Sequence, residues 1–377
     1  MSRTLSGHIL GPQGFVNGTI SFDTSGRVGA ISGSPVNAIA VRDSLLPVVL
    51  PGFIDLHVHG GGGRDIMEGG DAAARVAELH VKHGTTSMLA TTMTAPMSDL
   101  ETAFAGLKTV CAGRGPRAAR VLGVHLEGPY INGGKLGAQP GYARPFSADE
   151  LQRLHEMAPV RLITVAPEVP GNMQAVEDLV AAGFRVQLGH TLGSYEEGVE
   201  ALSRGAGGFT HLFNAMTGLH HREPGMVGAA LAHATYSEII PDLLHAHAGA
   251  IRVALRSIPC LFCVTDSTAA SGMPDGQYKL GRHSVTKCLG GVRLADGTLA
   301  GSTLTMDQAL RNLVNELDLE LPDASRRVST HAADYLGATD RGRLAPGAWG
   351  DVAVLNRDLE LTDVYVEGAS IDLAHAR

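Results

Sequence analysis

Histidines and a glutamate recur in this sequence at points where an extended apolar segment ends. His57 and His59 close the segment VVLPGFIDLHVH, and Glu127 lies at the end of RVLGVHLEG. His190 and His211 stand at the ends of two further apolar segments, FRVQLGH and GGFTHLFN. Imidazole nitrogens and carboxylate oxygens are ligands that Zn²⁺ and similar divalent ions take from proteins. The residue types therefore predict a divalent metal site, with Zn²⁺ as the expected ion.

The spacing of these residues supports the same prediction. In an extended strand, residues i and i+2 point to the same side, so His57 and His59 can share one ion. Glu127 can supply an oxygen from a neighbouring strand, and His190 and His211 can converge from two adjacent strands. A single histidine among the 17 in the chain is more often a surface or hydrogen-bonded residue. The prediction depends on the joint placement of all five.

A further carboxylate, Asp266, follows the apolar segment CLFCVTD. Its simplest alternative role is to cap the loop that comes next. As a functional group it is the expected general base, because a divalent ion lowers the pKa of a water towards ~7 and a nearby carboxylate can then accept the proton. The same carboxylate would later pass the proton to a departing nitrogen.

Eight extended segments, alternating with mostly helical ones, must position these side chains. The segments are 47–58, 85–92, 120–128, 161–168, 184–190, 207–214, 237–245 and 260–266. Eightfold alternation of strand and helix predicts an α/β fold with a (β/α)8 barrel of the TIM type. Catalytic groups of such barrels lie at the carboxyl ends of the strands, where the metal-competent residues stand.

The two ends of the chain have a different character. Residues 1–48 and 340–377 alternate apolar and polar residues between turn signals, and neither end has enough strands for a sheet of its own. We expect the two ends to pair into one small β-sandwich domain. The barrel, residues 49–339, is then inserted between them.

Composition excludes several classes of partner. A formal net charge of −8 argues against nucleic acid and anionic membrane as main partners. No apolar stretch approaches the ~20 residues that span a bilayer, and the start of the chain lacks the apolar region of a signal peptide. Cys260 and Cys263 form a CxxC string, but strand alternation puts their side chains on opposite faces and no second CxxC exists. We expect a cytoplasmic protein with reduced thiols.

Short motifs stand in a definite order along the chain: PGFIDLHVHGGGG, HLEGPYIN, LGHT, THLFNAM, REPGMVGAA, DLLH, VTDSTAASG and GRLAPGAWGDVAVL. The first resembles the opening metal motif of the amidohydrolase superfamily, and the last resembles its return into a small β-domain. The motifs between them follow in the order of the N-acetylglucosamine-6-phosphate deacetylases, so the chain resembles that family. The resemblance implies hydrolysis of the N-acetyl amide of an amino sugar 6-phosphate. N-acetylglucosamine-6-phosphate (GlcNAc-6-phosphate) would give glucosamine-6-phosphate and acetate.

The resemblance also implies a division of the metal ligands. Glu127, His190 and His211 would hold the principal ion, with Glu127 in place of the carboxylated lysine of many relatives. His57 and His59 would serve a second ion where one is bound. One or two divalent ions per subunit are therefore expected.

Further roles follow from matched motif positions. Asp266 matches the catalytic aspartate of the family, and His245 matches a substrate-binding histidine that can polarise the amide carbonyl. Asn214 and Ala215 match positions that contact the sugar phosphate. Arg222 matches an arginine that reaches the phosphate from the neighbouring subunit, which implies a homodimer.

Two positions depart from the family pattern. Relatives commonly carry a sugar-binding histidine in the loop after HLEGPYIN, where this chain has Gln139 in KLGAQPGYAR. Glutamine can hydrogen-bond a sugar hydroxyl but cannot carry charge, so another N-acyl hexosamine phosphate, such as N-acetylgalactosamine-6-phosphate (GalNAc-6-phosphate), stays open as the substrate. In DLLH, a leucine stands where relatives usually have glycine.

Three other interpretations were weighed. A hydrolase of cyclic amides or an adenine-type deaminase of the same superfamily is disfavoured by HLEGP and by the absence of a lysine from RLITVAPE. A non-catalytic scaffold would have lost ligands that this chain keeps. Gly60–Gly63 lacks the GxxxxGK[ST] spacing of a phosphate-binding loop, and we expect these glycines to let the chain turn at the barrel rim.

Overall fold

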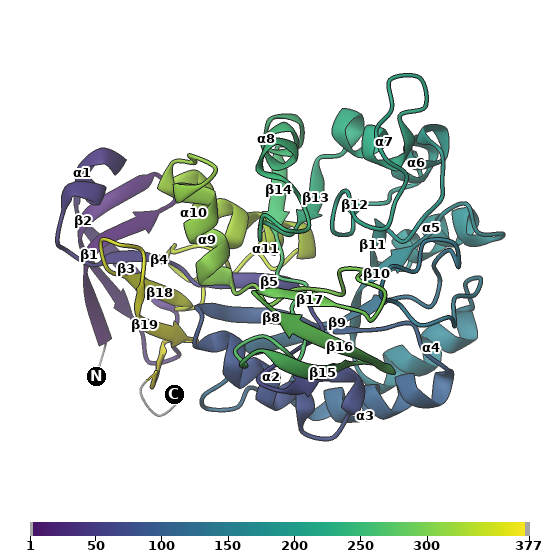
Figure 1. The fold of residues 1–377 in the computed structure, drawn as a ribbon. Coiled ribbons are helices and arrows are strands. Elements are labelled where there is room, and N and C mark those ends of the chain that lie inside the picture. The colour runs from purple at the N-terminus through teal and green to yellow at the C-terminus, as the bar shows by residue number, and fades with distance from the viewer. Residues whose placement is uncertain (1–2, 374–377) are drawn as a thin grey trace.

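A curled parallel β-sheet, the central sheet, forms the middle of the protein in a computed structural model that describes residues 3–373 (Figure 1). Its six strands lie in the order β12-β11-β10-β9-β8-β5. They are β5 (Phe53–Val58), β8 (Thr85–Thr92), β9 (Arg120–Glu127), β10 (Val160–Val165), β11 (Arg185–Leu188) and β12 (Gly208–Phe209). Every residue of β5 and β8 is buried, as in parallel strands that are covered on both faces.

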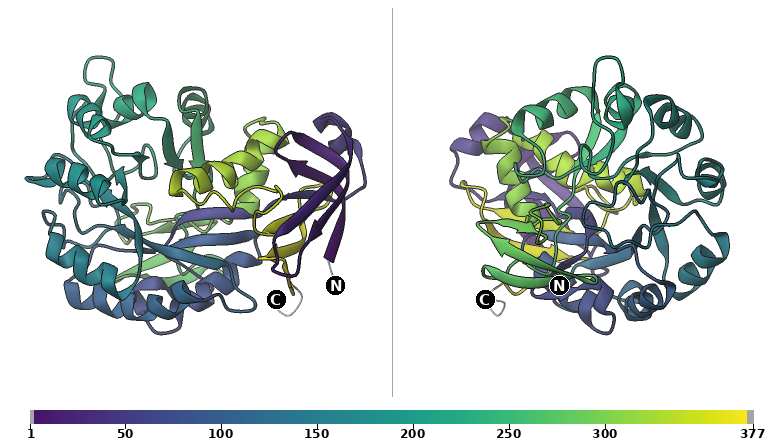
Figure 2. Two further views of the ribbon diagram at one scale, coloured as in Figure 1. Left: turned by 180° about the vertical axis from the view of Figure 1, so that it is seen from behind. Right: turned by 45° about the vertical axis from the view of Figure 1, so that its right-hand side comes forward.

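Two further parallel strands continue the curl. They are β13 (Tyr236–Ile239) and β14 (Cys260–Cys263). On one side, the backbone N–H of Leu212 donates to the carbonyl oxygen of Glu238 at 3.0 Å. On the other, the N–H of Asp266 donates to the carbonyl oxygen of His57 at 2.9 Å. The last strands therefore return towards the first, and helices surround the curl in the right-hand view of Figure 2.

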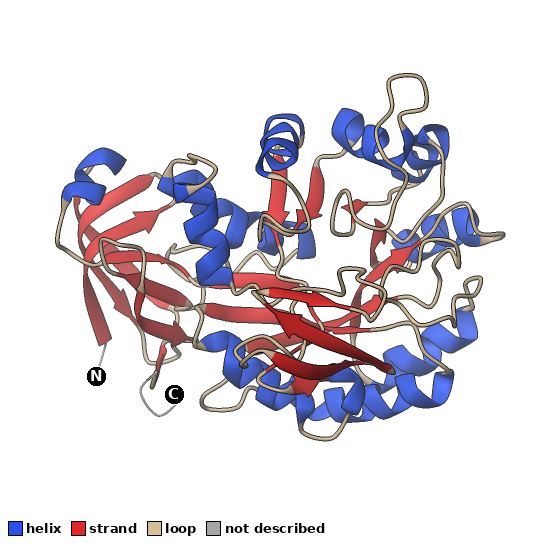
Figure 3. Ribbon diagram, viewed as in Figure 1, coloured by secondary structure: helices blue, strands red, loops and turns tan. Residues whose placement is uncertain are grey.

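Helices cover the outside of the curl, and most of them alternate with its strands along the chain (Figure 3). They are α2 (Ala72–Val81), α3 (Met97–Ala112), α4 (Ala148–Met157), α5 (Asn172–Ala181), α6 (Tyr195–Ser203), α7 (Gly225–His233), α8 (Ala248–Ser257), α9 (Met306–Asn315), α10 (Leu321–Val328) and α11 (Thr330–Leu336). Local sequence explains where helices begin: at α6, Ser194 and Glu197 exchange side-chain and backbone hydrogen bonds in a capping box. No helix among residues 3–373 is long and apolar enough to cross a membrane.

The two ends of the chain pair in a second sheet, the terminal sheet, as the sequence predicts. Its strands run in the order β20-β19-β18-β4-β1-β2-β3. They are β1 (Arg3–Gly11), β2 (Gly14–Phe22), β3 (Val28–Pro35), β4 (Val48–Pro51), β18 (Val352–Leu355), β19 (Leu361–Val366) and β20 (Ala369–Ile371). Hydrogen bonds join all seven in one mixed sheet, in which β4 pairs with both β1 and β18. Ile9, Ile20, Phe22 and Val49 pack in a core of its own.

Some elements differ from the sequence prediction. The expected strand 47–58 is two strands, because Gly52 separates β4 from β5 and a side chain there would lie 2.3 Å from Thr86. The expected strand 237–245 ends at Ile239, since Pro241 has no N–H for a sheet. A helix, α1 (Ala38–Asp43), occurs in a segment expected to form strands and turns.

Several short elements lie at the rim of the central sheet. They are β6 (Gly60–Gly61), β7 (Arg64–Asp65), the 3-10 helix η1 (Ile66–Glu68), β15 (Gly276–Leu280), β16 (His283–Cys288) and β17 (Gly291–Arg293). The last three form an antiparallel sheet. Leu280, Val285 and Val292 pack with Met93 in a small cluster beneath it. This places β15 at the edge of the site.

Candidate metal centre and active site

A cavity of about 220 Å³ opens at the carboxyl ends of the central strands. Of the eleven residues that the sequence predicts for the site, the cavity wall contains His59, Glu127, Gln139, His190, His211, Asn214, Ala215, His245 and Asp266. His57 is fully buried directly behind the wall. Arg222 is exposed and does not line the cavity.

The first group of metal-competent atoms is formed by Glu127, His190 and His211. Oε1 of Glu127 lies 3.0 Å from Nε2 of each histidine, and the two nitrogens lie 3.1 Å apart. Ligand atoms about 2.0–2.1 Å from a tetrahedral ion are roughly 3.3 Å from one another, so this spacing suits a common cation. Nδ1 of His190 lies 2.9 Å from the carbonyl oxygen of Lys135, and donating a hydrogen bond there leaves the Nε2 lone pair for a metal.

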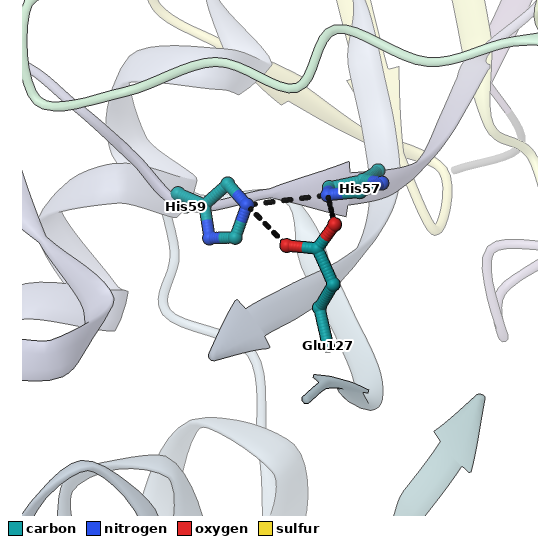
Figure 4. Close-up of side chains that lie close together, drawn as sticks. All are labelled: His57, His59 and Glu127. Carbon is teal, nitrogen blue, oxygen red and sulfur yellow. Dashed lines mark hydrogen bonds and ion pairs between the residues drawn. The ribbon is translucent and has the colours of Figure 1, made fainter. Parts of the chain in front are cut away.

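His57, His59 and the same Glu127 form a second group (Figure 4). The two histidine Nε2 atoms lie 3.2 Å apart. Nε2 of His57 is 3.5 Å from Oε1 of Glu127, and Nε2 of His59 is 3.1 Å from Oε2. Glu127 therefore belongs to both groups. The donor atoms of both groups fit a divalent metal.

Asp266 faces the histidine pair. Its Oδ1 lies 3.3 Å from Nε2 of His59 and 3.5 Å from Nε2 of His57. Burial alone would raise the pKa of Asp266, but the nearby charges of His57 and His59 hold it below its usual range. Asp266 is therefore a charged carboxylate that can accept a proton.

The same balance applies to the rest of the cluster. Burial alone would raise the pKa of Glu127, yet His57 and His190 hold it well below its usual range. Burial would lower the pKa of His59, but Asp266 and Glu127 raise it to about 9. The buried carboxylates thus stabilise positive charge at this site, and a bound divalent cation would supply that charge.

Left-handed backbone aims several of these side chains into the cavity. His190, His211, Ala215 and Asp266 have φ values of 49°, 30°, 51° and 51°. Residues other than glycine pay roughly 1–2 kcal/mol for this conformation, and such strain clusters at functional sites. The strands bring these residues to the rim, and the turn at each residue directs its side chain inwards.

His245 is held by a residue that the sequence analysis missed, Asp242. Oδ2 of Asp242 lies 2.6 Å from Nδ1 of His245, and Oδ1 accepts the backbone N–H groups of Leu244 and His245. Leu243, between Asp242 and His245, adopts φ 64° in the left-handed region. Burial alone would lower the pKa of His245, but the hydrogen bond and charge of Asp242 raise it. Because Asp242 holds Nδ1, the Nε2 side of the ring is left for the cavity.

Glu238, on β13, is a second missed residue. Its Oε2 lies 3.0 Å from Nδ1 of His57 and accepts the backbone N–H of His211 at 3.2 Å. The side chain is fully buried. The signal in the sequence was a carboxylate inside the apolar strand YSEII, which ordinary alternation would assign to solvent.

Of the remaining predicted residues, Asn214 and Gln139 line the cavity and Arg222 does not. Nδ2 of Asn214 donates to the carbonyl oxygens of His211 and Leu212, both at 3.3 Å. Nε2 of Gln139 donates a hydrogen bond to Oε2 of Glu127 at 2.6 Å. Arg222 lies on the exposed segment that leads into α7, outside the cavity wall of this chain.

Comparison with known proteins places the chain among related sequences. The model of the amidohydrolase family matches residues 48–371. An N-acetylgalactosamine-6-phosphate deacetylase of Escherichia coli O157:H7 is 37% identical over 356 residues, covering 91% of this chain and 92% of that protein. An N-acetylglucosamine-6-phosphate deacetylase of Lysinibacillus sphaericus is also 37% identical, over 330 residues, covering 85% of this chain and 84% of that protein.

Solved structures agree with the sequence matches. The N-acetylglucosamine-6-phosphate deacetylase of Mycobacterium smegmatis, an aspartate-to-alanine mutant in complex with N-acetylglucosamine-6-phosphate, superimposes with a TM-score of 0.88 at 33% identity. The comparison covers 98% of this chain and 99% of that one. The chain therefore belongs to the amidohydrolase family and, within it, to the N-acetylglucosamine-6-phosphate deacetylases.

Proposed function

We propose that this protein is a metal-dependent deacetylase that hydrolyses the N-acetyl amide of an amino sugar 6-phosphate. GlcNAc-6-phosphate is the expected substrate, and glucosamine-6-phosphate and acetate are the expected products. The observation that carries the proposal is the meeting of Glu127 with two histidine pairs, opposite Asp266, in one cavity. Relatives named for this reaction cover most of the chain.

Glu127, His190 and His211 would hold the principal ion, and His57 and His59 a second one. A divalent ion, with Zn²⁺ the expected identity, supplies polarisation of the amide carbonyl and a lower pKa for a water beside it.

The protein's own groups would then move the protons. Asp266 accepts a proton from the attacking water and delivers it to the departing amine. His245, oriented by Asp242, donates a hydrogen bond to the carbonyl oxygen as negative charge develops there. Without the proton from Asp266 the nitrogen would have to leave as an amide anion, which is a poor leaving group, and without His245 the charge on the oxygen would lack a hydrogen-bond donor.

For the sugar phosphate, Asn214 and Ala215 would contact it from the cavity wall. Arg222 does not line the cavity of its own chain, so a contact with the phosphate would come from Arg222 of a second copy in a homodimer. A guanidinium fork suits phosphate oxygens. We expect Arg222→Ala to raise KM for phosphorylated substrate far more than for its unphosphorylated analogue. Equal effects on both would contradict a phosphate contact.

The proposal extends to architecture and location. We infer a closed (β/α)8 barrel over residues 49–339, apart from the residues of β4 that pair in the terminal sheet, and a small β-sandwich domain from residues 1–48 and 340–377. The hydrogen bonds of Asp266 and Leu212 across the two gaps between strands support closure. All four cysteines are free thiols, which supports the cytoplasm as the location.

The exact hexosamine is the finer question. Gln139 stands where relatives commonly have a sugar-binding histidine, and two relatives of equal identity are named for different epimers. GalNAc-6-phosphate is therefore the second candidate substrate.

A deacetylation screen tests the proposal. Acetate release would be measured with GlcNAc-6-phosphate, GalNAc-6-phosphate, N-acetylmannosamine-6-phosphate and the three free sugars. We expect the highest kcat/KM for GlcNAc-6-phosphate and little turnover of free sugars. Preference for GalNAc-6-phosphate would move the assignment to that epimer. Hydrolysis of cyclic amides alone would overturn it.

A further inference from the structure

Gln139 has both ends of its side-chain amide engaged by the protein. Its Oε1 accepts the backbone N–H of Thr94 at 2.7 Å, and its Nε2 donates to Oε2 of Glu127 at 2.6 Å. Only 5% of the residue is exposed, although it belongs to a loop. Because both ends of the amide are fixed, Gln139 can hold the carboxylate of Glu127 in one position.

Thr94 decides which way the amide faces. A backbone N–H can only donate, so the amide oxygen of Gln139 must point towards Thr94 and the NH₂ group towards Glu127. Thr94 is itself packed against Gly128, where an added Cβ would lie 2.0 Å from the threonine Oγ1. The donor to Glu127 therefore has a fixed position and a fixed orientation.

This contact determines how Glu127 divides its two oxygens. Oε1 lies 3.0 Å from Nε2 of both His190 and His211 and 3.5 Å from Nε2 of His57, while Oε2 lies 3.1 Å from Nε2 of His59. A hydrogen bond to Oε2 stops the carboxylate from rotating about its last bond. Because glutamine carries no charge, it fixes Glu127 without adding a positive charge that would repel a cation.

We propose that Gln139 is a positioning residue of the metal centre, which holds Glu127 with Oε1 towards His190 and His211 and Oε2 towards His59, and so sets the affinity for divalent ions. The inference rests on the proposed role of Glu127 as a metal ligand. It gives Gln139 a task different from contact with a sugar hydroxyl. Partners behind metal ligands typically contribute about 10- to 100-fold to metal affinity.

The test compares Gln139→Leu, Gln139→His and Gln187→Leu in the full-length protein. Zn²⁺ affinity would be measured by competition with a chromophoric chelator, and coordination by the visible absorption of the Co²⁺-loaded protein. Gln187 is the matched control, because it is also a fully buried glutamine and accepts a hydrogen bond from Thr210 rather than contacting a predicted ligand.

We expect Gln139→Leu to weaken Zn²⁺ binding by about 10- to 100-fold and to alter the Co²⁺ spectrum. Gln139→His can still donate a hydrogen bond and should retain most of the affinity, while Gln187→Leu should match the wild type. At saturating Zn²⁺, KM of Gln139→Leu for GlcNAc-6-phosphate should stay within about three-fold of the wild type. Gln139→Ala, which cannot overpack the wall, serves as a second variant should the leucine disturb folding.

Two results separate the possible failures. Wild-type Zn²⁺ affinity and an unchanged Co²⁺ spectrum in both Gln139→Leu and Gln139→Ala, with a raised KM, would make Gln139 a sugar-binding residue and overturn the inference. Absence of Zn²⁺ binding by the wild type itself would instead overturn the proposed function.

Discussion

Nδ1 of His57 lies 3.0 Å from Oε2 of Glu238, and neither side chain has any exposed surface. The other ring nitrogen of His57 faces Glu127 and His59. A carboxylate at Nδ1 keeps the proton there and presents the lone pair of Nε2 to a metal. Since Glu238 also accepts the N–H of His211, one buried carboxylate braces both histidine pairs.

Glu238→Gln tests this brace. The amide oxygen must still accept the N–H of His211, but it carries no charge and is a weaker acceptor for the proton on Nδ1 of His57. The ring proton is then held less firmly on Nδ1, and a proton on Nε2 blocks that nitrogen as a ligand. We expect the second ion to bind about 10- to 100-fold more weakly, with a smaller effect on the first. The affinity for each ion is measured as the number of Zn²⁺ ions bound per subunit after dialysis against a series of free Zn²⁺ concentrations. Glu196→Gln, on the exposed side of α6, is the control, and equal stoichiometry in both variants would contradict the brace.

Asp266→Asn tests the proton carrier. The amide keeps the size of the side chain but cannot accept the proton of the attacking water, so we expect kcat to fall by at least about 10²-fold. Zn²⁺ content and substrate affinity, measured by calorimetry, should stay near the wild type. A variant with near-normal kcat would remove Asp266 from the mechanism.

Asp242→Asn tests the control of His245. The negative charge of Asp242 raises the pKa of His245, so its removal lowers that pKa. With one ring proton held on Nδ1, only the protonated imidazole can donate from Nε2 to the amide carbonyl, and activity should therefore be lost at a lower pH on the alkaline side. The pH profile of kcat measures the shift. An alkaline limb that stays in place would show that His245 does not set it.

Leu289→Asn tests a strained turn beside the site. Leu289 and Gly290 join β16 to β17 with φ values of 50° and 79°, a pattern that favours Asn-Gly. Leu289 is 92% exposed, so its replacement sacrifices no packing. We expect stabilisation by about 1 kcal/mol, measured by unfolding, whereas Leu45→Asn, exposed but without a positive φ, should gain nothing. Equal effects of the two changes would argue against relief of strain.

The sequence alone indicates much of this site. His57 and His59 are two residues apart at the end of β5, and strand periodicity is enough to put both on one side. Glu127 ends β9 as expected, and β8 spans the predicted segment 85–92. These features were predictable because strand period and rim position are local properties of the chain.

Contacts between distant segments were not predictable in the same way. Glu238 meets His57 across 181 positions, and Gln139 meets Thr94 across 45. Only the curl of the central sheet brings such pairs together, so each side chain alone carries no sign of its partner. The ends of some strands were mispredicted for a related reason. β4 was expected to belong to the first barrel strand, but in the terminal sheet it pairs with β1 and β18, which are distant in the sequence.

The most direct test is acetate release from GlcNAc-6-phosphate by protein that has been stripped with a chelator and then reloaded with Zn²⁺, in the wild type and in Glu127→Ala. The account predicts that the stripped wild type is inactive, that Zn²⁺ restores one acetate per amine formed, and that Glu127→Ala binds little Zn²⁺ and regains little activity. Full activity of the stripped wild type, or of Glu127→Ala, would contradict it.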